Sequence, residues 1–150
     1  MHLDSQPPDG FQLLNDGSDF LVHNGPLYER CVPGNLEDFR YSLTLRVQDK
    51  HTNSFGSCHG GMLTTLSDAL TGFAARYFIG DKPVVTVSLN TDFSDYARVG
   101  EWIQGTARIS AETRSLIFVS GNLCVDDRTL AVTQAVWKKV SESIAPQPTP

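Results

Sequence analysis

Residues 53–68 read Asn-Ser-Phe-Gly-Ser-Cys-His-Gly-Gly-Met-Leu-Thr-Thr-Leu-Ser-Asp, and this stretch decides both the fold and the candidate chemistry. A His-Gly-Gly turn at residues 59–61 is followed by apolar residues at three- and four-residue intervals, which predicts one long helix over residues 60–78. The first N–H groups of a helix have no partners within it and carry partial positive charge. They suit a carbonyl oxygen that becomes negative during acyl transfer. Asp68, on the same helix, supplies a base or a nucleophile.

The spacing between Gly60 and Asp68 indicates how such a site would be assembled. The eight residues that separate them rise about 12 Å along a helix, so Asp68 cannot act at the turn of its own chain. A catalytic base must lie within about 3 Å of the proton that it moves, or one water molecule away. We therefore expect the two elements to come from two copies of the chain, in a symmetric dimer with two shared sites.

Composition limits the class of protein. A length of 150 residues fits one domain, and a net charge of −5 with no basic face argues against a nucleic-acid-binding protein. The three cysteines lack paired spacing, which predicts a protein of the reducing cytoplasm without disulfides. The first ten residues lack a basic region followed by an apolar core, and no apolar run is long enough to span a membrane, so we expect a protein that is not exported. Polar and Pro-rich ends predict flexible segments at residues 1–15 and 141–150, around one domain over residues 16–140.

The rest of the domain reads as strands. Alternating or β-branched residues predict strands over residues 39–47, 85–93, 102–109, 116–125 and 130–140. Short turns between the later strands favour antiparallel neighbours, so the simplest fold is α+β, with one long helix against one curved antiparallel sheet. Residues 11–27 could add a strand, cover a pocket or lie on a partner chain, and the sequence does not choose among these.

One face of the predicted helix is unusual for a helix in contact with water. It carries small residues where Lys and Glu are common, namely Thr64, Asp68, Thr71, Gly72 and Ala75. We therefore expect a ligand or a partner chain to cover this face.

The order of these motifs resembles a known family. The spacing of Asn53, Gly56, His59-Gly60-Gly61 and Asp68 is similar to that of the PaaI-like acyl-CoA thioesterases, in the 4-hydroxybenzoyl-CoA thioesterase superfamily. The resemblance covers roughly residues 26–140. It implies the hotdog fold, in which a sheet of five or six antiparallel strands wraps one long helix, and it implies a homodimer or a homotetramer built as a dimer of dimers.

The resemblance also implies a role for each of five residues. The Gly60 backbone N–H would be the oxyanion donor, and Asp68 of the partner chain would be the general base or the nucleophile. Asn53 would orient the attacking water or hold the thioester. His59 would support the turn near the substrate sulfur, and Thr86 would help to hold Asp68. The implied reaction is hydrolysis of an acyl- or aryl-CoA thioester to a free acid and CoA, with no metal and no cofactor.

Five further residues are predicted to bind the substrate. Gly61 belongs to the oxyanion turn, and Phe55, Met62 and Leu63 would line the acyl pocket. Several basic residues lie on the late strands and their turns, and we expect one of them, Arg114, to contact the CoA phosphates. The sequence does not distinguish aromatic acyl groups from medium or long aliphatic ones.

Other interpretations are weaker. Cys58 lies beside His59, but adjacent side chains point apart, which argues against a thiol nucleophile. The four histidines lack the pairing of zinc sites. A non-catalytic hotdog protein that binds acyl-CoA as a sensor or carrier is the main alternative. An enoyl-CoA hydratase would need a His paired with Asp or Glu for proton transfer to carbon, and we see no such pair.

Overall fold

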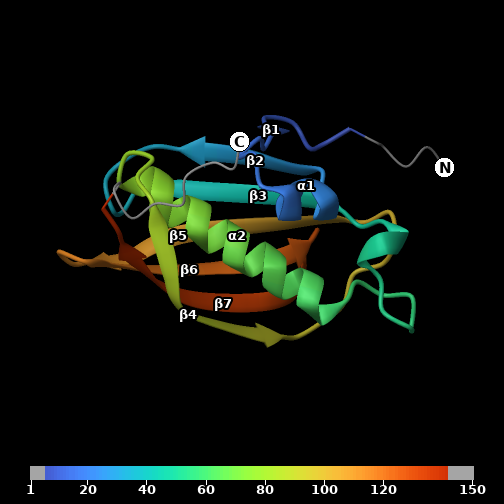
Figure 1. Cartoon of the computed structure of the whole chain (residues 1–150). Coiled ribbons are helices and arrows are strands. Elements are labelled where there is room, and N and C mark those ends of the chain that lie inside the picture. The colour runs from blue at the N-terminus through green and yellow to red at the C-terminus, as the bar shows by residue number, and fades with distance from the viewer. Residues whose placement is uncertain (1–5, 142–150) are drawn as a thin grey trace.

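One long helix, α2, lies across the face of a curved antiparallel sheet (Figure 1). The structure is a computed structural model and describes residues 6–141. The sheet has seven strands in the order β1-β2-β3-β5-β6-β7-β4, and every neighbouring pair is antiparallel. The predicted α+β architecture is therefore confirmed, with seven strands in place of the five or six expected.

The elements have the following bounds. The strands are β1 (Gln12–Leu13), β2 (Leu27–Val32), β3 (Arg40–Arg46), β4 (Val84–Phe93), β5 (Trp102–Glu112), β6 (Leu116–Val125) and β7 (Arg128–Lys139). The helices are α1 (Asp19–Asn24), α2 (Gly60–Phe78) and the short 3-10 helix η1 (Asp49–His51). Residues 1–5 and most of the predicted C-terminal flexible segment lie outside the described residues, and the domain boundaries stay a prediction.

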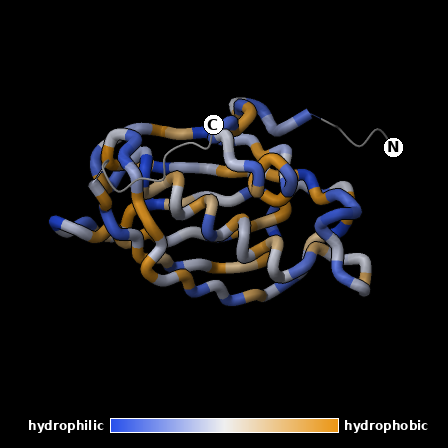
Figure 2. Tube along the Cα trace, viewed as in Figure 1, coloured by the Kyte–Doolittle hydropathy of each residue, from blue (hydrophilic) through white to orange (hydrophobic). Residues whose placement is uncertain are grey.

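The bounds of α2 follow from its local sequence. His59 is the N-cap, and its Nδ1 accepts a hydrogen bond from the Gly61 N–H at 2.8 Å. The apolar stripe of α2 is buried against the sheet, and Figure 2 shows hydrophobic positions recurring along the helix and the strands behind it. The chain leaves the helix through Gly80 and Asp81, whose φ angles of 81° and 61° lie in the left-handed region. The helix predicted over residues 60–78 is confirmed at both ends.

The small residues of α2 are covered in part by the chain itself. Thr71, Gly72 and Ala75 are buried, and a Cβ at Gly72 would lie 2.7 Å from Cη2 of Trp137 on β7. The Trp137 indole N–H donates to Thr71 Oγ1 at 3.2 Å. The expectation that a ligand or partner covers this face is thus wrong for Thr71 and Ala75, whereas Gly72, although packed against Trp137, also lines a cavity beside Asp68. That expectation stays a prediction for Thr64 and Asp68, which are only partly buried.

The N-terminal region, which the sequence left open, adds two strands and a short helix. β1 and β2 extend the sheet, and α1 lies beside α2 (Figure 1). The sequence of β2 lacks the usual alternation of apolar and polar residues, because the charged residue Glu29 lies on the buried face of the strand. The Glu29 carboxylate accepts hydrogen bonds from Tyr41 at 2.8 Å and from Tyr77 at 3.4 Å. Burial and the nearby carboxylate raise the pKa of Tyr77 to about 12, so it stays a donor at neutral pH.

Candidate active site

The His-Gly-Gly turn leaves one backbone donor unused. The His59 carbonyl accepts from the N–H groups of Met62 and Leu63, at 2.8 and 3.1 Å, and the His59 ring accepts from Gly61. The Gly60 N–H has no acceptor among residues 6–141. An unsatisfied donor at a helix N-terminus is the arrangement that stabilises an oxyanion. Gly60 is therefore free for its predicted role, whereas the Gly61 N–H is already occupied.

Neighbouring segments fix the position of this turn. The Cys58 N–H donates to the Ala97 carbonyl, and the His59 N–H donates to the His51 carbonyl, both at 2.8 Å. Ser57 also forms a β-bridge with Arg98. These backbone hydrogen bonds to two separate segments hold the Gly60 donor in place before a substrate arrives, as oxyanion stabilisation requires.

Asn53 organises the loop that leads into the turn. Its Oδ1 accepts from the backbone N–H groups of Phe55 and Ser57, at 2.9 and 3.2 Å, and its Nδ2 donates to Ser57 Oγ at 3.0 Å. This is the local turn that Asn commonly forms in loops. Phe55 lies within the loop, with its side chain 92% exposed. Within one chain, the Asn53 amide is engaged by the loop, and its predicted contact with water or thioester stays a prediction.

Asp68 lies on the third turn of α2, half buried, and contacts β4. The Thr86 hydroxyl donates to Asp68 Oδ1 at 3.2 Å, beside an irregularity in the pairing of β4 with β7. Burial raises the pKa of the Asp68 carboxyl above its usual value, and the Thr86 hydrogen bond partly opposes this shift. A carboxylate that is desolvated but still reaches solvent is a stronger base than a fully hydrated one.

The structure does not bring Asp68 to Gly60 within one chain. Both belong to α2, and the eight residues between them span about 12 Å of helix. The prediction of a shared site assumed one continuous helix from Gly60 past Asp68, and the structure has this helix. Whether two chains share the site stays a prediction.

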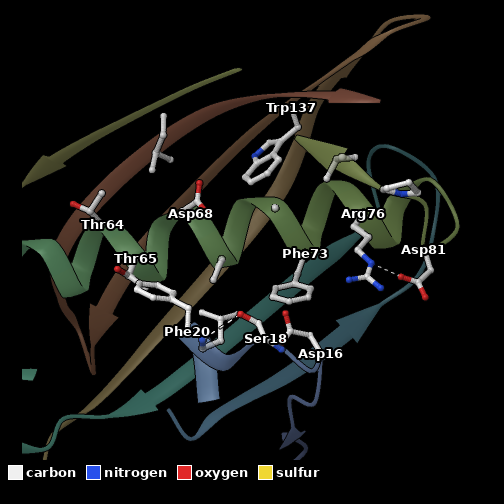
Figure 3. A pocket seen from close by; sticks show the side chains of 16 residues that line it. Asp16, Ser18, Phe20, Thr64, Thr65, Asp68, Phe73, Arg76, Asp81 and Trp137 are labelled. Atoms are coloured by element: carbon white, nitrogen blue, oxygen red, sulfur yellow. Dashed lines mark hydrogen bonds and ion pairs between the residues drawn. The ribbon is translucent and has the colours of Figure 1, made fainter. Parts of the chain in front are cut away.

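A cavity of about 920 Å³ runs along the outward face of α2 beside Asp68 (Figure 3). Phe20 and Leu21 of α1 line one side of it, and Trp137 and Leu89 line the other. Phe20, Leu21 and Trp137 are not among the site residues predicted from the sequence. The local signals for α1 are the cap Ser18, which accepts from the Leu21 N–H at 3.3 Å, with Asp19 in the first turn and His23 in the last. A helix of six residues is too short to show periodicity.

Four predicted binding residues lie away from this cavity. Met62 and Leu63 are buried in the hydrophobic core, and Phe55 projects from the loop before α2. Arg114 lies in the turn between β5 and β6. None of these four lines the cavity, so a role for them requires either a partner chain or a part of the substrate that lies outside it.

Two other features bear on the chemistry. Burial raises the pKa of the Cys58 thiol to about 11, which disfavours the thiolate needed for nucleophilic attack. Within residues 6–141, no group of three or more His, Cys, Asp or Glu side chains is arranged to hold a metal ion.

No helix among the described elements is long and apolar enough to cross a membrane.

One family model and several known proteins are similar to this chain. Residues 55–132 match the thioesterase superfamily. The chain is 35% identical over 133 residues to "Putative esterase PA0474" of Pseudomonas aeruginosa. This match covers 87% of this chain and 95% of that protein. It is 34% identical over 79 residues to acyl-coenzyme A thioesterase 13 of Mus musculus, and this match covers 53% of the chain and 56% of the relative. The chain therefore matches about half the length of the second relative.

The fold is also similar to that of a solved protein. The PaaI protein of Escherichia coli, from its phenylacetic acid degradation operon, superposes with a TM-score of 0.65. The superposition covers 75% of this chain and 80% of PaaI, at 17% sequence identity. At this identity the likeness concerns the fold.

Proposed function

Because this chain belongs to the thioesterase superfamily and is a thioester hydrolase, we propose that its substrates are acyl- or aryl-CoA thioesters, cleaved between Asp68 and the Gly60 turn of a partner chain. The observation that carries this proposal is the Gly60 N–H. It is the one donor of the turn without an acceptor among residues 6–141, and the hydrogen bonds of Cys58 and His59 to two other segments hold the turn in place. Asp68 then supplies the proton acceptor or nucleophile that thioester cleavage requires.

Symmetry limits how two chains can share this site. If a two-fold axis ran parallel to α2, Asp68 of the partner would lie about 12 Å along the axis from Gly60. An axis perpendicular to α2 that passes near Thr64, midway between the two residues, brings each Gly60 opposite the partner's Asp68. The two helices are then antiparallel, and one operation creates two identical sites.

β4 is suited to such an interface. It is the outer strand of the sheet and pairs only with β7, so its other edge has no strand partner within residues 6–141. Its side chains Val85, Val87 and Phe93 are exposed in the single chain. An apolar, unpaired edge strand is a site for association with another chain. A second copy that pairs along β4 would cover these side chains.

The proposed reaction needs no group beyond those described. Asp68 takes a proton from water as the water oxygen bonds to the thioester carbon, and the partner's Gly60 N–H stabilises the oxyanion that forms. The C–S bond then breaks, and the proton passes from Asp68 to the leaving thiolate of CoA. In the alternative route Asp68 attacks the carbon itself, the C–S bond breaks and a mixed anhydride forms with release of the CoA thiolate. Water then cleaves the anhydride to the free acid and the Asp68 carboxyl, and the proton released goes to the thiolate.

Thiol release measured with a disulfide reagent tests the proposed function. We expect turnover of acyl-CoA substrates from a panel of acetyl, octanoyl, palmitoyl and phenylacetyl thioesters. Saturable binding of acyl-CoA with no thiol release over hours would instead favour a non-catalytic sensor or carrier. Absence of both turnover and binding across the panel would reject CoA thioesters as ligands.

The contact between Thr86 and Asp68 predicts a shift in the pH profile. The hydroxyl stabilises the carboxylate form, so Thr86→Val should raise the pKa of Asp68 further. Since Asp68 acts in its ionised form, the rising acid limb of kcat against pH should move to higher pH, and activity above this limb should change less. Thr86→Ser keeps the hydroxyl and is the matched control. An acid limb at the same pH in the parent and Thr86→Val would exclude this coupling.

A further inference from the structure

The short helix α1 exposes large apolar side chains to solvent. None of its residues is fully buried, and Phe20 and Val22 are 60% and 68% exposed. Leu21 packs against the core. An exposed Phe that lines a cavity gains stability when a ligand covers its ring.

Hydrogen bonds hold α1 in place despite its shortness. Ser18 caps its N-terminus. At its other end the Asn24 carbonyl contacts Nε2 of the buried His51 at 2.8 Å, and the Lys50 ammonium donates to the His23 carbonyl at 2.7 Å. His51 also accepts at its carbonyl from His59, the cap of α2. The position of α1 is therefore tied to the turn that carries the Gly60 donor.

The cavity has a defined floor, two sides and a far end. Its floor is the outward face of α2, where Ala69 and Gly72 are small, and Figure 3 shows Phe20 and Trp137 on opposite sides of that helix. From Asp68 the cavity continues toward Arg76, eight residues and about 12 Å further along α2. There the Arg76 Nε is paired with Asp81 Oδ1 at 2.5 Å. The apolar part thus ends at an ion pair.

The charged side chains that line the cavity indicate which part of the substrate binds in it. Three carboxylates, Asp16, Asp68 and Asp81, line the cavity with a single cation, Arg76, which Asp81 already pairs. The phosphates of CoA would be repelled by this net negative lining. An uncharged acyl group meets no such penalty and would cover the apolar sides.

We propose that this cavity is the acyl subsite, that it takes aromatic or medium-chain apolar acyl groups, and that Phe20 of α1 is a specificity-determining wall. The inference rests on the proposed thioesterase function. The ion pair of Arg76 and Asp81 lies about 12 Å along α2 from Asp68, a length that corresponds to about nine extended C–C bonds. It limits the acyl group to about this length, because a longer chain would leave the apolar lining for charged side chains that are 40% and 61% exposed.

Phe20→Ala and Val22→Ala form a matched pair of variants. Both side chains lie on α1 and are similarly exposed, but only Phe20 lines the cavity. We expect the parent to hydrolyse octanoyl- and phenylacetyl-CoA with higher kcat/KM than acetyl- or palmitoyl-CoA. Phe20→Ala should lower kcat/KM for octanoyl-CoA about tenfold and leave acetyl-CoA unchanged, because the lost contacts are apolar. Val22→Ala should match the parent for all four substrates.

The outcomes separate this inference from the proposed function. Equal efficiency with palmitoyl- and octanoyl-CoA would overturn the length limit, and an unchanged ratio of octanoyl to acetyl efficiency in Phe20→Ala would overturn the wall. If no CoA thioester is cleaved, the proposed function fails, and binding still tests the subsite. S-octyl-CoA, a thioether that cannot be hydrolysed, should then change the intrinsic tryptophan fluorescence of the parent on binding and bind about tenfold more weakly to Phe20→Ala. Equal binding by the two would reject the subsite.

Discussion

Asp68→Asn is expected to lower kcat for acyl-CoA hydrolysis by about 10³-fold, with little change in KM. Asn has nearly the same shape and can still accept the Thr86 hydrogen bond, but it cannot take a proton from water or attack the thioester. The loss would correspond to about 4 kcal/mol of transition-state stabilisation. Steady-state thiol release with an octanoyl or phenylacetyl thioester measures it.

The same variant should be at least as stable as the parent, which separates loss of catalysis from loss of folding. Burial raises the pKa of Asp68 in the folded protein, so the ionised carboxyl is less favourable there than in the unfolded chain. Its cost appears as pH rises through the folded pKa and is present at neutral pH. Removing the charge should therefore preserve or raise Tm at pH 7. A variant with full activity would exclude the catalytic role of Asp68.

Isotope labelling then distinguishes the two routes open to Asp68. In a single turnover in H₂¹⁸O, attack by water places the label directly in the released acid. Attack by Asp68 instead transfers an unlabelled carboxylate oxygen to the acid, and the label enters the protein when water cleaves the anhydride at the Asp68 carbonyl. Mass spectrometry of the acid and of the peptide that contains Asp68 measures both, and label in that peptide would establish attack by Asp68.

Gly60→Pro is expected to lower kcat by about 10²- to 10³-fold, the usual effect of removing an oxyanion donor. Proline has no N–H, and the first helical position is where a helix accepts it best. The preceding residue, His59, has φ −63° and ψ 137°, which is the extended conformation that a following proline requires. The substitution therefore removes the donor while α2 keeps a compatible start.

Gly60→Ala is the control for this variant. Among residues 6–141, a Cβ at Gly60 would meet no atom within 4 Å apart from its chain neighbours and the nearby backbone of its own helix, and the N–H is retained. We expect Gly60→Ala to keep most of the parent activity. Equal losses in both variants would indicate that bulk at this position, and not the missing donor, causes the effect. Circular dichroism and Tm should show that both variants stay folded.

Mixing the two inactive variants tests whether the sites are shared. In a mixed dimer, Gly60 of the Asp68→Asn chain faces Asp68 of the Gly60→Pro chain, so one of the two sites is intact. Random exchange at equal concentrations makes about half of the dimers mixed, and activity should recover to about one quarter of the parent value. Each variant incubated alone under the same exchange conditions is the control. A site contained in one chain would show no recovery after subunit exchange.

Local patterns were sufficient to predict the helix and most of the sheet. The bounds of α2 and β6 agree with the sequence prediction, because each has periodic burial and a clear turn at its ends. The resemblance to PaaI-like hotdog thioesterases is confirmed by the family match, the relatives and the shared fold. Gly60 and Asp68 could be found because a turn and a helix place them within one short segment. Their catalytic roles remain the proposals tested above.

The N-terminal elements could not be predicted in the same way. β1 has two residues and α1 has six, which is too short for periodicity to appear. In β2 the inward residue Glu29 is charged, and its burial depends on Tyr41 and Tyr77 from elsewhere in the chain. Long-range partners determine the burial of such a residue, so its local sequence does not predict the strand.

The long helix, the antiparallel strands, the family and the spacing that separates Gly60 from Asp68 all follow from local sequence patterns. The folded chain was needed to show that Trp137 covers Gly72, that α1 lies beside α2, and that a cavity with a negative lining extends from Asp68 to an ion pair. The physical reason is the range of the interactions. Turns, caps and periodic burial act between residues a few positions apart, whereas the cavity is built from α1, α2, β4 and β7, which meet only when the sheet has formed.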